Sequence, residues 1–268
     1  MRAVRHVAVN VFRESVRDKV PLNLVFFAVL LMSASYLLGQ LTAGQDVKII
    51  KDLGLAATSA FGLFIAVFIG IGLVFKEVER RSVYGLLAKP IRRHEFIAGK
   101  YLGLVLTLAV NLAVMTLALY VVLGYMSWME TENVKQAWDA PATDPALLKA
   151  VLLIFVELCL ITAVALFFST FSTPMLSAVL TFGLYVVGHF NADLKNFENV
   201  VESPVVIYLA RGLYYVLPNL APFDVKADVV HAVPVSWTYI AMTTGYGLVY
   251  IVMLILTAMV IFARRDFK

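Results

Sequence analysis

The chain has 268 residues, of which 61% are hydrophobic and 15% charged, and its mean hydropathy is +0.86. Soluble domains carry about a quarter charged residues, so the composition excludes a soluble domain of average type and indicates a polytopic membrane protein. The formal net charge of +4 comes from basic residues beside apolar runs, which indicates membrane topology rather than nucleic-acid binding. The single cysteine, Cys159, excludes an intramolecular disulfide.

The first twenty residues show a helical pattern of their own. Apolar residues recur at helical spacing, with Arg5, Arg13, Glu14 and Arg17 on other faces. The pattern predicts a helix on the inner membrane surface before the first span, and a solvated basic leader is the alternative. We expect no cleavable signal peptide, because the first apolar run is long enough to span.

Six runs are apolar and long enough to cross a bilayer, which needs about 20 residues. They predict an all-α membrane protein with spans at about 21–41, 53–75, 99–125, 148–171, 174–191 and 235–263. Spans four and five follow each other across Ser169–Thr173, and Pro174 suits the first turn of a new helix. The pattern therefore predicts a tight turn there, and we expect the whole chain, 1–268, to form one transmembrane domain.

The outer segment, residues 192–234, contains a further short apolar stretch. Residues 204–217 read PVVIYLARGLYYVL, and a charge such as Arg211 is costly at mid-membrane. We therefore expect an interfacial or re-entrant helix rather than a seventh span. The segment is interpreted as a lid packed over the bundle, as an outer gate with Arg211 as the gate residue, or as a docking surface for an outer partner.

Lysine and arginine indicate the orientation of the spans. If the N-terminus is inside, 15 of the 22 basic residues lie inside and 7 outside. This bias predicts that both termini and the loop 76–98 face the cytoplasm. Trp128 and Trp237 would then lie at the outer interface, where indole rings are favoured.

The loop 76–98 joins spans two and three and is densely charged, with a short apolar core. Its middle is long enough for about two helical turns, which Pro90 would end. The chemistry leaves two interpretations open. The loop docks into a groove on a partner protein, or it only fixes topology and rests on anionic lipid.

The same loop resembles the signature loop of type-2 ABC transporter permeases. The resemblance rests on Glu79, Ser82, Leu86-Leu87, Pro90-Ile91, Arg93, Phe96 and Gly99-Lys100. Arg81 stands where glycine is usual, and Arg92 where a small polar residue is common. The six-span layout, the Ser/Thr turn and the closing Arg264-Arg265-Asp266-Phe267 are also similar. The segment 213–220, LYYVLPNL, is similar to a subgroup that contains permeases for copper-enzyme maturation and multidrug-type exporters.

The resemblance implies a membrane subunit of an ABC exporter, not an enzyme. It implies that the loop is a coupling helix seated in a separate P-loop ATPase subunit, which would carry ATP and Mg, and that a second permease chain, identical or related, completes the translocation path. The coupling residues would be Glu79, Arg80, Arg81, Ser82, Val83, Tyr84, Leu86, Leu87, Pro90 and Arg93. A multi-pass location in a prokaryotic cytoplasmic (inner) membrane is also implied.

No nucleotide, cofactor or metal site is expected on this chain. A P-loop needs G-x-x-x-x-G-K-[ST], and the only Gly-Lys pair, Gly99-Lys100, is followed by Tyr101 and lacks the first glycine. Lys100 is interpreted as an interface anchor. The four histidines are spread over both sides of the predicted membrane, so they do not suggest a metal or haem centre.

Glu157 is the one acidic residue inside a predicted span, without an obvious basic partner in the membrane. It is interpreted as an interhelical hydrogen-bonding group, as a residue of the transport path or chain interface, or as a proton or cation site. Thr107 and Asn111 share a helix face and suggest either packing contacts or a polar spot on the path.

Two alternative functions remain: an ion- or proton-coupled secondary transporter using Glu157, and a membrane assembly subunit that transports nothing. Drugs, lipids, peptides, ions and a sulfur species all remain open as substrates.

Overall fold

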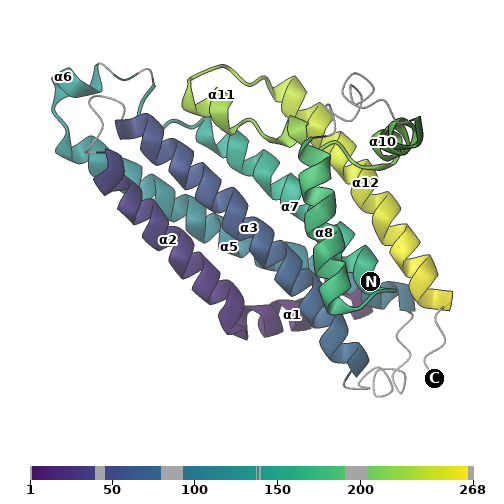
Figure 1. Ribbon diagram of the computed structural model, residues 1–268. Helices are drawn as coiled ribbons and strands as arrows, with labels where there is room; N and C mark the ends of the chain where they lie inside the picture. The colour runs from purple at the N-terminus through teal and green to yellow at the C-terminus, as the bar shows by residue number, and fades with distance from the viewer. Residues whose placement is uncertain are drawn as a thin grey trace.

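The computed structural model describes residues 2–39, 46–79, 93–136, 138, 140–190 and 204–264, and within these ranges every regular element is a helix (Figure 1). This confirms the predicted all-α membrane architecture. In chain order the elements are α1 (Arg2–Arg17), α2 (Lys19–Gly39), α3 (Asp46–Glu79), α5 (Arg93–Met129), α6 (Glu132–Lys135), α7 (Leu147–Ser169), α8 (Pro174–His189), α10 (Pro204–Val216), η2 (Ala221–Phe223), α11 (Lys226–Val230) and α12 (Trp237–Arg264).

Five of these helices, α2, α3, α5, α7 and α12, are long and apolar enough to cross a membrane. The sixth predicted span corresponds to α8, which has 16 residues and is therefore about 24 Å long, short of the roughly 30 Å hydrocarbon core. Six spans therefore stay a prediction that depends on α8.

Two helices are longer than the predicted spans because charged residues continue them. α3 begins at Asp46 rather than near residue 53, and it includes Lys51, whose side chain is 1% exposed. The Lys51 Nζ donates a hydrogen bond of 2.8 Å to the carbonyl of Pro141, so the loop before α7 satisfies this buried charge. α5 likewise begins at Arg93, ahead of residue 99.

The core of the bundle is formed by α3 and α7. In each, 72% of the most apolar stretch is buried, whereas α2 and α12 bury 22% and 28% of theirs. Figure 1 shows α2, α3, α5 and α7 running side by side, with α12 on the other flank of the bundle. The outer helices keep large apolar side chains exposed, including Leu117, Met242 and Val249, which is the surface a bilayer covers.

Glycines on α3 allow the close packing of this core. A Cβ built on Gly62 would lie 2.5 Å from the Leu158 Cδ1 of α7, and one on Gly70 would lie 3.0 Å from the Ala165 Cβ. Gly54, on the same helix, makes an equally close approach to Leu119 of α5. Small residues let helix backbones approach in membranes, where dispersion contacts rather than water exclusion hold helices together.

The predicted tight turn between spans four and five is present. α7 ends at Ser169, and Thr173 is the N-cap of α8, with its hydroxyl accepting a hydrogen bond of 3.5 Å from the Leu176 amide. Pro174 occupies the first turn, where its missing N–H costs nothing. The Ser172 and Ser177 hydroxyls lie 2.6 Å apart and tie the turn to α8.

The basic-rich segments gather at one end of the bundle, which we call the basic end: it holds α1, the end of α3, the start of α5 and the end of α12 (Figure 1). α6, α11 and the start of α12 lie at the opposite end. Trp128, near the end of α5, and Trp237, at the start of α12, are 78% and 67% exposed at that opposite end. Two exposed indoles there fit the predicted interfacial belt.

α1 crosses the basic end beneath the bundle (Figure 1) and packs on α5. A Cβ on Gly99 would lie 2.7 Å from the Val7 Cβ, and one on Gly103 would lie 2.7 Å from the Ala8 carbonyl oxygen. Val11 is 3% exposed at this contact. The N-terminal segment is therefore a packed amphipathic helix, not a solvated leader.

Candidate functional site

Of the ten predicted ATPase-coupling residues, the structure describes only Glu79 and Arg93, which lie at the basic end. α3 ends at Glu79 and α5 begins at Arg93. The others, Arg80, Arg81, Ser82, Val83, Tyr84, Leu86, Leu87 and Pro90, lie in the range 80–92, which the structure does not describe. The described ends show only that the chain leaves α3 and enters α5 at the same end of the bundle (Figure 1).

The start of α5 is held firmly just after this connection. Lys100 is 1% exposed, and its Nζ lies 4.7 Å from the centre of the Phe96 ring. Phe96 in turn stacks on Phe262 of α12, with ring centres 5.9 Å apart. The interpretation of Lys100 as an interface anchor is therefore wrong: its ammonium is buried in the junction between α5 and its neighbours.

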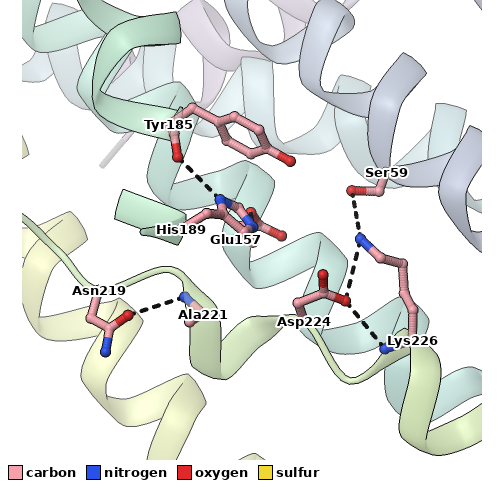
Figure 2. A network of polar contacts seen from close by, with 8 residues as sticks. All are labelled: Ser59, Glu157, Tyr185, His189, Asn219, Ala221, Asp224 and Lys226. Carbon is pink, nitrogen blue, oxygen red and sulfur yellow. Dashed lines mark hydrogen bonds and ion pairs between the residues drawn. The ribbon is translucent and has the colours of Figure 1, made fainter. Parts of the chain in front are cut away.

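Charged and polar side chains from α3, α7, α8 and the outer segment form a cluster (Figure 2). Its centre is Glu157, placed by α7 in the core and 1% exposed. The His189 Nε2 on α8 lies 3.3 Å from the Glu157 Oε1, within ion-pair distance. That carboxylate oxygen makes no well-aligned hydrogen bond, so the contact with the imidazole is electrostatic.

The orientation of His189 is set by its own helix. The His189 Nδ1 lies 3.1 Å from the Tyr185 carbonyl oxygen one turn earlier, and the two rings are 4.5 Å apart. If the Nδ1 carries a proton and donates it to this carbonyl, the Nε2 faces Glu157 as an acceptor or, when the ring is charged, as a second donor. The pair can hold one proton between a carboxylate and an imidazole, or lock α8 to α7.

The outer segment contributes Asp224 and Lys226 to the cluster, beside α7 and α8. The Lys226 Nζ lies 3.4 Å from the Asp224 Oδ1 and 3.5 Å from the Ser59 Oγ of α3 (Figure 2). Lys226 therefore links the segment to α3, while Glu157 belongs to α7. Three helices and the outer segment thus meet around these charges.

The outer segment is packed and hydrogen-bonded as a lid over the bundle. The Leu220 amide donates to the Gly188 carbonyl at 2.9 Å, and the Asn219 amide donates to the Tyr246 hydroxyl at 2.7 Å. Phe223 and Leu220 are fully buried. Residues 218–230 are thus packed against the bundle as the lid interpretation expects, and a gating role stays a prediction.

Arg211 lies apart from this packed part of the lid. It belongs to α10, which confirms a short helix at the opposite end, and its side chain is exposed. Its role as a gate residue stays a prediction.

Thr107 and Asn111 use their side chains locally. The Thr107 hydroxyl donates to the Gly103 carbonyl at 3.0 Å, and the Asn111 amide donates to the Thr107 carbonyl at 2.9 Å. Both bonds stay within α5, so neither residue supplies an interhelical hydrogen bond there. Thr107 is buried, and Asn111 is half-buried near the surface of the chain.

The partner of Glu157 is the functional feature that the sequence interpretation missed. A signal was present: Glu157 precedes Thr170 by thirteen residues, and His189 follows Ser172 by seventeen. In an antiparallel hairpin these positions come within about one helical turn of the same level. Within the described residues, no group of three or more His, Cys, Asp or Glu side chains is placed to hold a metal ion.

Comparison with known proteins adds a family relationship. A family model described as ABC-2 family transporter protein matches residues 6–267, which is nearly the whole chain. No curated protein matches the chain significantly.

Proposed function

Because the chain belongs to the ABC-2 transporter family, and is thus a multi-pass membrane permease of an ABC transporter, we propose that it forms the translocation path of an exporter. A second permease chain, identical or related, completes this path. A separate P-loop ATPase subunit, which binds ATP and Mg, supplies the energy. The loop 76–98 transmits motion from that ATPase to the bundle.

The observation that carries this proposal is the convergence of α3, α5, α1 and α12 at the basic end. The connection between α3 and α5 leaves and returns at this end, where α5 is fixed by α1 and α12. A push on this connection would be transmitted into α5 and α3 rather than absorbed, because packed helices move as rigid elements. The excess of lysine and arginine supports a cytoplasmic position for this end, with both termini on the cytoplasmic side of a prokaryotic inner membrane.

In this proposal Glu157 and Thr107 do not line the path between two chains, because both are only 1% exposed and lie inside their own chain. Asn111 is the one of the three predicted path residues whose side chain is near the chain surface, so it is the one that could contribute to a path between two chains.

Co-purification tests the proposal. Wild-type chain and the double variant Leu86→Asp/Leu87→Asp are isolated from native membranes, and bound protein is assayed for a P-loop ATPase. We expect the wild type to retain an active ATPase and the double variant to lose it. The matched control is Val134→Asp, an apolar-to-acid change in the described residues of the opposite end, which should retain the ATPase. Absence of an ATPase from the folded wild type would overturn the proposal.

The Glu157–His189 pair supports one other function, proton-coupled secondary transport. Intramembrane carboxylates paired with imidazoles can relay protons. That function predicts uptake or efflux driven by a proton gradient in vesicles of the purified chain without ATPase, and loss of this transport in Glu157→Gln. ATP-dependent transport that persists in Glu157→Gln would favour the exporter.

A further inference from the structure

A polar hollow of about 720 Å³ lies at the elbow between α1 and α2. Its lining residues are Asn10, Arg13, Glu14, Arg17, Asp18 and Lys19. Three of the six are cationic and two are anionic. The function proposed above makes no use of this hollow.

The elbow geometry follows from the pattern of α1. Asn10, Arg13, Glu14 and Arg17 are spaced as i, i+3, i+4 and i+7, so they form one stripe along the helix. The face that carries Val11 packs on α5 instead. Packing on α5 thus turns the charged stripe away from the bundle.

The cations of the hollow are available to a ligand. Among the described residues, neither Arg13 nor Arg17 forms an ion pair with a carboxylate, and both side chains are exposed. Asp18 is engaged locally, since its Oδ1 accepts a hydrogen bond of 3.2 Å from the Val20 amide at the start of α2. That hydrogen bond does not remove the charge of Asp18, so Asp18 and Glu14 both lower the positive potential, and the three cations leave the hollow a formal net charge of +1.

Apolar side chains border the charged stripe on its exposed side. Val9, Val16 and Val20 are 39%, 51% and 47% exposed beside Arg13 and Arg17. A soluble acidic partner would match the cations but would not account for the exposed valines beside them. A lipid supplies both halves of the match, an anionic headgroup for the cations and acyl chains for the valines.

We propose that the hollow at the α1–α2 elbow binds the phosphate headgroup of an anionic phospholipid, with Arg13 and Arg17 as its principal ligands. Guanidinium groups suit this task because their planar fork donates two parallel hydrogen bonds to phosphate oxygens. The position fits the ligand, because the elbow is where the surface helix meets the first spanning helix. A bound lipid would hold α1 against the membrane and against α5.

Native mass spectrometry of the purified full chain tests the site. The chain is delipidated and offered an equimolar mixture of phosphatidylglycerol and phosphatidylcholine in detergent. We expect preferential retention of phosphatidylglycerol, reduced about fivefold by Arg13→Gln or by Arg17→Gln, since each cation near a membrane surface contributes roughly that factor. Arg5→Gln is the matched control, because Arg5 is an exposed arginine of the same helix outside the hollow.

Glu14→Gln supplies a second test with the opposite sign. Removal of this acid raises the positive potential of the hollow, so phosphatidylglycerol retention should rise about twofold or more. This variant keeps the arginines, so the test does not depend on variants that weaken the fold.

Each contrary outcome overturns the proposal in its own way. Equal retention of the two lipids, or equal losses in Arg5→Gln and Arg13→Gln, would show that the hollow does not select a headgroup. Displacement of the lipid by millimolar inorganic phosphate would indicate a site for free phosphate. Loss of a co-purified ATPase in Arg13→Gln, with lipid retention unchanged, would make the surface a protein-docking face.

Discussion

The His189 imidazole lies 3.3 Å from the Glu157 carboxylate and joins α8 to α7 inside the bundle. The tight turn at Thr170–Ser172 makes this possible, because it folds the two helices into an antiparallel hairpin. Burying an ionisable pair in a membrane core costs desolvation free energy unless each member compensates the other by charge pairing or hydrogen bonding. The pair is therefore the natural place to measure how the hairpin is held together.

A double-mutant cycle measures the Glu157–His189 interaction. We expect His189→Gln to destabilise the chain more than Glu157→Gln, because it leaves a buried carboxylate without its basic partner. The double variant should lose less than the sum of the two, with a coupling free energy of about 0.5–3 kcal/mol from unfolding in detergent. Glu157→Gln combined with a change at the exposed His231 should be additive, and additivity in both cycles would contradict the contact.

Gly62 tests the packing of α3 on α7. Gly62→Ala should lower the free energy of unfolding by about 1–3 kcal/mol, because the new methyl would lie 2.5 Å from the Leu158 Cδ1. Gly72→Ala, in the same helix, meets nothing within 4 Å and should be neutral or stabilising by up to about 1 kcal/mol. Thermal unfolding in detergent compares the two, and equal effects would show that the close approach is absent.

The variant Gly103→Val tests the packing of α1 on α5. In Gly103→Val the new side chain meets the backbone carbonyl of Ala8, which cannot move by a rotamer change, so α1 should be displaced. The reporter is thiol labelling of Val11→Cys in a Cys159→Ala background, since Val11 is 3% exposed. We expect labelling to accelerate at least tenfold. Gly124→Val, on α5 with open space around it, should leave Val11→Cys protected.

The lid was among the features that the sequence identified only in outline. The length of the outer segment suggested a lid among other interpretations, but its packing depends on long-range contacts such as Tyr246 to Asn219, which no local pattern encodes. The turn before Pro174 was predictable because the signal is local. The early start of α3 was not, because the buried Lys51 is stabilised by a hydrogen bond to the distant Pro141 carbonyl, which no local pattern encodes.

Phe223 tests the seating of the lid. Phe223→Ala should weaken residues 218–230 by about 3–5 kcal/mol, because the fully buried ring packs near Tyr246 and Gly247. Hydrogen exchange of this segment should rise while α3 and α7 stay protected. Phe171→Ala, a half-exposed phenylalanine at the α7–α8 turn, is the matched control and should leave the segment unchanged. Unchanged exchange in Phe223→Ala would mean that the lid is held elsewhere.

The central claim is that the connection between α3 and α5 contacts a separate ATPase at the basic end. A photo-crosslinking amino acid at Tyr84, within that connection, tests it most directly, with Trp128 at the opposite end as the control position. In native membranes the account predicts an adduct between the chain and a P-loop ATPase from position 84 and none from position 128. No ATPase adduct from position 84 of the folded chain, or one from position 128, would contradict it.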